Sequence, residues 1–132
     1  NGMGRTTCSF YTPNNDHIVF SSTHAASKEC PVEPDKSKGY MWPIYPTYQF
    51  YRARVDGKDV IPIEPGAPSS YNAELVTCKD GKVVFTSDRG GDLDLYVGRL
   101  DARGMIVDVK QFTNTLGYDG GAFFSPDCSK LV

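Results

Sequence analysis

The chain has 132 residues, a length suited to one domain, and its 14 lysines and arginines against 16 aspartates and glutamates give a formal net charge of -2. This balance lacks the clustered basic face that nucleic acid or an anionic membrane surface attracts, so we expect no nucleic-acid partner. Hydrophobic residues make up 39% of the chain but are dispersed, and no apolar run approaches the roughly 20 residues of a transmembrane segment. The opening Asn1-Gly2-Met3 has neither an initiator methionine nor an apolar signal core, which predicts a processed or truncated N-terminus.

The predicted elements are all strands. The first two lie between Cys8 and Ser22, on either side of a polar turn, and another covers residues 50–55 before the Asp56-Gly57 turn. No stretch of about a dozen residues keeps apolar side chains at helical spacing without a glycine or proline inside it. Asp-Gly and Gly-Gly pairs, which supply the positive φ of tight hairpins, separate four further predicted strands: Ala73–Thr77, Val83–Ser87, Leu93–Leu100 and Val107–Phe112.

These elements recur at a fixed period. Tyr71 and Tyr118 lie 47 positions apart, as do Asp80 and Asp127, and this spacing is close to the roughly 40–50 residues of a propeller blade. The chain therefore divides into blade 1 at about 4–66, blade 2 at about 70–116 and part of blade 3 at about 117–132. Because a propeller has about 4–8 blades, we expect a fragment of a larger propeller, or a piece held by other protein in an assembly.

The repeats resemble a known family, the TolB-type, WD40-like propeller repeat that is also called PD40. The resemblance covers nearly the whole chain outside one insertion and rests on Ser125-Pro126-Asp127, Phe85-Thr86-Ser87, Asp94-Leu95-Tyr96, Val55-Asp56-Gly57 and Gln111-Phe112-Thr113. It implies an all-β fold of consecutive four-stranded antiparallel blades. It also implies a non-catalytic scaffold that binds protein in a bacterial periplasm or cell envelope.

The repeats depart from this pattern at their turns. Pro13-Asn14-Asn15 stands where the family has Pro-Asp-Gly, a mild change because asparagine tolerates the left-handed conformation. Cys128 stands where glycine is usual, and a Cβ at positive φ is strained, which leaves the turn type open.

An insertion distinguishes blade 1. Phe20 and Tyr51 lie 31 positions apart, whereas their counterparts Phe85 and Tyr96 lie 11 apart, so about 20 residues have been added at about 23–47. Long loops on rigid scaffolds are often functional, and tryptophan and tyrosine are enriched in binding hot spots. The insertion is therefore a candidate docking loop for a protein partner, through Tyr40, Trp42 and Tyr45. The alternative is that it folds over an outer blade edge and covers it.

Catalytic and cofactor motifs are scarce. The chain has two histidines, His17 and His24, and neither a Gly-x-Ser-x-Gly elbow nor a phosphate-binding glycine loop. We therefore expect no active site and no cofactor within this chain. Two alternative hypotheses place the chain in a larger protein or assembly. The first is that it is the propeller domain of a prolyl-oligopeptidase-like hydrolase, and the second is that it is a peripheral subunit docked on a membrane protein complex.

Metal sites are also poorly supported. A partial ligand set lacks the paired spacing of zinc sites: Cys8, His24, Glu29 and Cys30. The acidic stretch from Asp88 to Asp94 is similar to a calcium loop, but Gly90 occupies the place of its second acidic ligand. We expect no metal ion at either place.

The four cysteines allow two disulfides. Cys8 and Cys30 could tie the insertion to blade 1, a bond that the export implied by the resemblance would permit. Cys78 and Cys128 lie 50 positions apart, about one blade, and neighbouring blades diverge at their rims. We therefore expect a Cys8–Cys30 disulfide and none between Cys78 and Cys128.

Overall fold

The structure, a computed structural model, describes residues 2–64 and 69–132, and every regular element within these ranges is a strand. Two four-stranded antiparallel sheets follow one another, with the orders β1-β2-β3-β4 and β5-β6-β7-β8. The strands are β1 (Thr6–Tyr11), β2 (His17–Ser22), β3 (Gln49–Arg54), β4 (Ile61–Pro62), β5 (Asn72–Thr77), β6 (Lys82–Ser87), β7 (Asp94–Leu100) and β8 (Ile106–Gln111). The expected all-β fold of four-stranded antiparallel blades is confirmed. No helix in the described ranges could cross a membrane.

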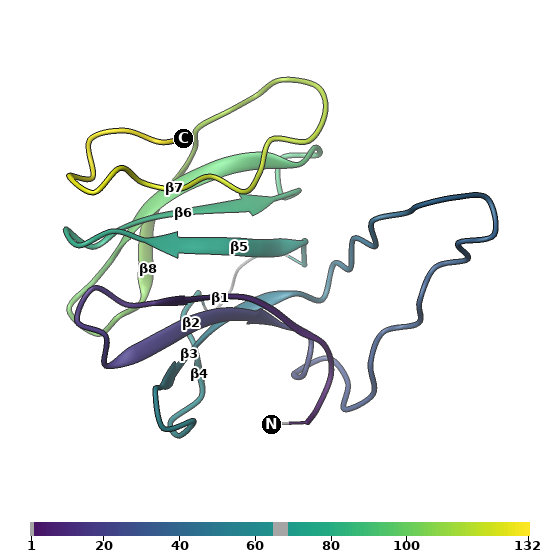
Figure 1. Cartoon of the computed structure of the whole chain (residues 1–132), viewed down its shortest axis with the longest axis horizontal. Coiled ribbons are helices and arrows are strands. Elements are labelled where there is room, and N and C mark those ends of the chain that lie inside the picture. Colours follow the sequence, from purple (N-terminus) through teal and green to yellow (C-terminus); the bar gives the residue numbers. More distant parts are fainter. Residues whose placement is uncertain (1, 65–68) are drawn as a thin grey trace.

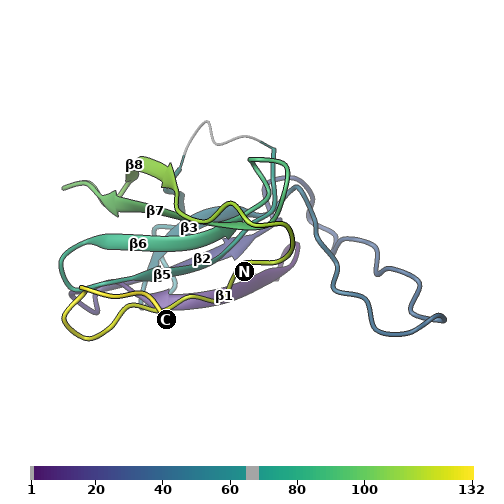
Figure 2. The ribbon, with the colours of Figure 1, turned by 90° about the horizontal axis from the view of Figure 1, so that it is seen from above.

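The innermost strands of the two sheets lie side by side. β1 and β5 run next to each other, and the C-terminal segment follows along β5 (Figures 1 and 2). This segment forms a single bridge between Phe124 and Leu131, which marks the start of a third repeat. The predicted end of blade 1 at about residue 66 lies outside the described residues, and the blade limits stay predictions.

The register shows that the two sheets are copies of one unit. Phe20 pairs with Tyr51 in the first sheet as Phe85 pairs with Tyr96 in the second. The four strands predicted in the second unit agree with β5 to β8 to within one residue at each end. Both sheets are therefore built from consecutive antiparallel strands, and in the first sheet the long insertion joins β2 to β3.

Each innermost strand carries a bulge at the same place. The pairing shifts register between Thr7 and Phe10 in β1, and between Ala73 and Val76 in β5. Cys8 (φ 52°) and Glu74 (φ 59°) take the left-handed conformation there, and Gly121 (φ 68°) takes it one period after Glu74. A bulge of this kind bends the strand and turns its side chains, so equivalent residues of three repeats gather along the inner edge.

The main core lies between the two sheets. The rings of Phe50 and Phe85 meet edge to face with their centroids 4.9 Å apart, and both side chains are fully buried. This cluster of buried apolar side chains comprises Val19, Phe50, Ile63, Leu75, Val83, Phe85, Tyr96 and Ile106. Because its members come from both sheets, neither sheet can bury its face alone.

One ion pair reinforces this junction. The Arg89 guanidinium donates two hydrogen bonds to the Glu64 carboxylate, at 2.7 and 2.9 Å, and both side chains are only 12% exposed. The same guanidinium stacks over the rings of Phe85 and Tyr96. Glu64 follows β4, so the pair joins the end of the first sheet to the second.

The first sheet has a histidine at the place of Arg89. His24 follows Ser22 by two positions, as Arg89 follows Ser87, and its ring packs on Tyr51 with centroids 4.2 Å apart. Its Nδ1 lies 2.8 Å from Ser22 Oγ. Burial, followed by the positive charge of the N-terminus, lowers the pKa of His24 below its usual 6.5.

Removing the Phe85 ring should destabilise the whole chain. Phe85→Ala leaves a cavity between the sheets, and we expect a loss of about 3–5 kcal/mol in the free energy of unfolding, measured in urea. Phe112→Ala is the matched control, because Phe112 is largely exposed and its loss should cost about 0.5 kcal/mol or less. Equal losses in the two variants would contradict an inter-sheet core centred on Phe85.

Acidification should weaken the fold through His24. Because its pKa is lower in the folded chain than in the unfolded chain, the unfolded chain binds the proton more readily. Stability is therefore complete above about pH 6.5 and falls as the pH drops below that value. We expect His24→Phe to reduce the loss in melting temperature between pH 7.5 and 5.5, whereas His17→Gln retains it. If the loss in melting temperature is unchanged in His24→Phe, a group other than His24 causes the acid sensitivity.

Candidate partner-binding surface

The insertion projects from one end of the sheets. Residues 23–47 form no strand or helix and extend away from both sheets, at the end where β2 stops and β1 and β5 begin (Figures 1 and 2). It does not lie along the outer strands β4 or β8. The projecting conformation leaves several large side chains of the insertion exposed to solvent.

The N-terminal segment anchors the insertion. Gly4 N donates a hydrogen bond to Lys28 O at 2.8 Å, and Cys30 Sγ donates to Gly4 O at 3.2 Å. Arg5 forms an ion pair with Glu33. These contacts hold the first half of the insertion against the start of β1.

Tyr45 closes the base of the insertion. Its hydroxyl donates to Val32 O at 2.9 Å, and its ring lies under the Arg5 guanidinium, 5.8 Å from the ring centroid. On the other side it contacts the buried ring of Tyr48, with centroids 6.1 Å apart. Tyr45 is therefore a structural support in this conformation, rather than a freely presented side chain.

Trp42 and Tyr40 are presented to solvent. Trp42 is 55% exposed and lies beside Tyr71, the residue that precedes β5. Tyr40 is 86% exposed. The structure thus separates the three aromatic residues proposed from the sequence into one support and two exposed side chains, with Met41 and Ile44 exposed beside them.

A recess of about 390 Å³ opens under this aromatic group. Tyr48 and Tyr71 form its floor, and their rings meet edge to face with centroids 5.7 Å apart. Burial raises the pKa of Tyr71 to about 12, although the neighbouring Trp42 opposes that shift. Arg5 and Lys36 lie at its margin. Sequence reasoning used Tyr71 as a repeat marker only and missed Arg5, which no motif distinguishes.

A polar cluster continues from this end along the inner edge. Glu74 accepts hydrogen bonds from the Tyr118 hydroxyl and from Gly121 N, both at 2.8 Å, and from Thr86 Oγ1 at 2.7 Å. It thereby ties β5 to the third repeat. Burial and the hydrogen bond to Glu74 raise the pKa of Tyr118. Cys8 lines the same inner edge, beside a recess of about 290 Å³.

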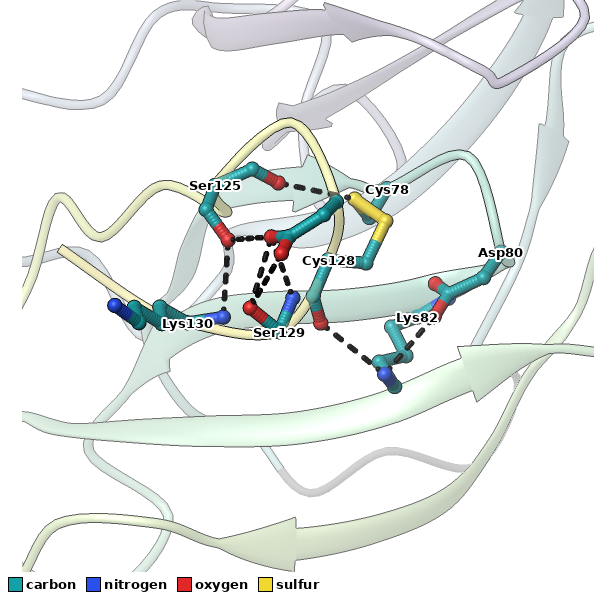
Figure 3. A network of polar contacts seen from close by, with 8 residues as sticks. Cys78, Asp80, Lys82, Ser125, Cys128, Ser129 and Lys130 are labelled. Carbon is teal, nitrogen blue, oxygen red and sulfur yellow. Dashed lines mark hydrogen bonds and ion pairs between the residues drawn. A yellow bond between two sulfur atoms is a disulfide. The ribbon is translucent and has the colours of Figure 1, made fainter.

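The disulfide lies at the opposite end of the sheets and joins the pair that the sequence argument rejected. Cys78 and Cys128 are bonded, with their Cα atoms 5.9 Å apart, whereas Cys8 and Cys30 are free (Figure 3). The predicted Cys8–Cys30 disulfide is therefore not formed, and the exclusion of Cys78–Cys128 was wrong. Blades diverge at their rims, but both cysteines lie in turns next to the innermost strands, where neighbouring blades converge.

Polar contacts reinforce the disulfide. Lys82 Nζ donates to Cys128 O at 3.2 Å and pairs with Asp80 at 2.9 Å (Figure 3). Within the third turn, hydrogen bonds from Ser125 and Ser129 lower the pKa of Asp127 to about 2. Cys128 takes the left-handed conformation (φ 61°), as do Gly81 and Asn15 in the corresponding turns. The strained cysteine that the sequence suggested is thus held by a covalent bond.

The candidate metal ligands are engaged with the protein. Cys78 and Cys128 lie close to Asp80, but their sulfur atoms are bonded to each other and offer no thiolate. In the stretch similar to a calcium loop, Asp92 accepts Gly117 N and Asp94 accepts Gln111 Nε2, each at 2.8 Å. These carboxylates therefore act as acceptors within the fold instead of converging on a cation.

The comparisons with known proteins support the fold. No protein-family profile matches the chain, and no curated protein does. Among solved structures, the chain is similar to the "putative TolB" from Agrobacterium tumefaciens, with 24% sequence identity and a TM-score of 0.55. The similarity covers 84% of this chain and 34% of that protein, so the chain spans about a third of its length. The chain therefore has the fold of part of a TolB-like propeller.

Removing the observed disulfide should destabilise the chain more than removing the free thiols. The bond closes a loop over a sequence separation of 50, for which chain entropy predicts a loss of about 4 kcal/mol in the free energy of unfolding. We expect this loss in the double variant Cys78→Ser, Cys128→Ser under oxidising conditions. The control variant, Cys8→Ser with Cys30→Ser, should change stability little.

Peptide mapping without reductant checks the pairing directly. Peptides containing Cys78 and Cys128 should appear linked, while Cys8 and Cys30 take up an alkylating reagent. Alkylation of Cys78 in the oxidised chain would contradict this assignment.

Proposed function

We propose that this chain is a non-catalytic protein-binding module of the TolB-like propeller type, and that it binds its partner through the surface formed by the insertion. The observation that carries the proposal is the exposure of Tyr40 and Trp42 on a loop that projects from the sheets and is anchored at its base. Met41 and Ile44 extend the apolar surface next to them. Large exposed side chains of these types gathered in one place are characteristic of interaction sites.

The anchoring favours binding by reducing its entropic cost. The pair Arg5–Glu33 and the hydrogen bond from Tyr45 to Val32 limit the conformations of the insertion before a partner arrives. Trp42 lies beside the buried Tyr71 at the wall of the same recess. A loop that is ordered in advance loses less conformational freedom on association, so more of the contact energy contributes to affinity.

One serine–histidine pair resembles a nucleophile with its base, but its surroundings indicate a structural role. Ser22 Oγ lies 2.8 Å from His24 Nδ1, but Ser22 is completely buried and its hydroxyl also accepts a hydrogen bond from Thr6. A substrate cannot reach this oxygen in the folded chain. We therefore assign the pair to packing and infer no catalytic step.

The disulfide supports a location outside the cytoplasm. Cysteine pairs persist in oxidising compartments such as the bacterial periplasm and are reduced in most cytosols. The Cys78–Cys128 bond thus fits a protein of the bacterial cell envelope. We propose this location together with the binding role.

Site-specific photocrosslinking tests the proposal. A benzophenone amino acid placed at Tyr40 should crosslink a protein partner in bacterial envelopes that carry the chain. The matched control is Tyr11, which is 57% exposed and lies at the far end of β1, away from the insertion. Mass spectrometry of the adducts identifies the partner.

A second change separates specific binding from chance contact. Trp42→Ala should weaken the Tyr40 crosslink at least about tenfold, because hot-spot truncations cost 2 kcal/mol or more. Adducts that form equally from Tyr11, or that survive Trp42→Ala, would refute the binding surface. A membrane protein among specific adducts would place the module at a membrane complex.

A further inference from the structure

A second cleft lies between the two sheets, at the end opposite the insertion. It encloses about 530 Å³ and is bounded by the turns that join β1 to β2, β5 to β6 and β7 to β8. Arg52 on β3 lines it from the first sheet, and Lys79 lines it from the second.

Arg52 breaks the pattern of the repeat. It pairs with Val19 in the first sheet as Val97 pairs with Val84 in the second, so blade 1 carries a guanidinium where blade 2 carries an apolar side chain. Packing of the sheet does not require a charge at this position, since Val97 fills it in the other copy.

The guanidinium is held against the neighbouring blade. A Cβ at Gly104 would lie 2.1 Å from Arg52 Nη1 and 3.0 Å from its Cζ, which shows that the guanidinium packs directly beneath that turn. Gly104 also has a positive φ of 74°, which other residues adopt with strain. This packing places the charge between the two sheets, at the wall of the cleft.

Arg52 nevertheless lacks an acceptor. Its Nε is buried without a hydrogen-bond partner, and within residues 2–64 and 69–132 its side chain forms no ion pair. A buried donor without a partner costs free energy, and a guanidinium is among the strongest donors of a protein. Arg52 is only half-buried and lines the cleft, so its guanidinium is free to donate to an oxygen atom of a ligand bound there.

The nearby carboxylates interact with other groups of the protein. Asp16 pairs with His17, and Asp80 pairs with Lys82, each at 2.9 Å. Asp101 accepts backbone hydrogen bonds from Arg103 and Met105 at 2.9 Å. The cleft thus contains three satisfied anions and an unsatisfied guanidinium.

We propose that this cleft binds the carboxylate of a small organic acid, with Arg52 donating hydrogen bonds to it and Lys79 adding positive charge at the mouth. A guanidinium matches the planar, two-oxygen geometry of a carboxylate. A single negative charge suits the site better than the double charge of phosphate, because the three aspartates repel the extra charge. This site is separate from the insertion and does not depend on the binding role proposed for it.

Nuclear magnetic resonance of the isotope-labelled chain tests the site with four probes: acetate, N-acetylalanine, N-acetylalanine amide and inorganic phosphate. The amide signals of Gly81 and Gly104 report on the cleft, because both glycines line it. We expect acetate and N-acetylalanine to shift these signals with affinities of the order of 1 mM. The uncharged amide should have no effect, and phosphate should bind more weakly than either carboxylate.

Two variants identify the residues responsible. Arg52→Gln should weaken binding about tenfold or more, as expected for loss of a charged hydrogen bond, and Lys79→Gln about threefold. Arg99→Gln is the matched control, since Arg99 is exposed and paired with Asp108 outside the cleft, and it should bind normally. Lys79 is exposed, so its variant keeps the test decisive if Arg52→Gln does not fold.

Three outcomes would overturn the proposal. The first is that none of the probes shifts Gly81 or Gly104. The second is binding that is unaffected by both variants. The third is preference for phosphate or for the uncharged amide, which would contradict a carboxylate site.

Discussion

The contact between the two sheets is the constraint on which the rest of the structure depends. The edge-to-face pair of Phe50 and Phe85 lies at its centre, and side chains from both sheets complete the cluster. A four-stranded sheet has two faces and too few residues to cover either one, so each blade must be buried by the next. Arg89 and Glu64 then fix the junction with a largely buried ion pair.

This radial arrangement explains which distant residues meet. Near the innermost strands the turns of successive blades converge, and there Cys78 reaches Cys128 and Thr77 Oγ1 donates to Tyr11 O at 2.9 Å. The same innermost turns, together with the turn between β7 and β8, bound the cleft that holds Arg52. The spacing of residues in the sequence predicts the period of the repeat. It does not predict how far a residue lies from the innermost strands. The disulfide was therefore assigned to the wrong pair, although the four strands of the second repeat were placed to within one residue.

The insertion shows the other limit of sequence reasoning. Its length and aromatic composition follow from comparing the two repeats, so Tyr40, Trp42 and Tyr45 could be selected. The different roles of these three residues could not be predicted. A segment without hydrophobic periodicity gives no indication of which side chains are buried and which are exposed. The support of Tyr45 by Arg5, and the position of Trp42 beside Tyr71, arise from contacts between segments that no repeat unit relates.

Comparison of the two repeats distinguishes positions that the fold requires in every blade from positions that differ between the copies. Phe20 and Phe85 occupy the same register position, and each ring stacks on the tyrosine paired with it, as expected of a position that every blade needs for its core. Where the copies differ in charge, as at Arg52 and Val97, the fold tolerates both, so packing does not dictate the charge. Aligning the repeats by strand register before assigning roles would have drawn attention to Arg52. In a repeat protein, the differences between equivalent positions are thus a more direct guide to candidate sites than the features the copies share.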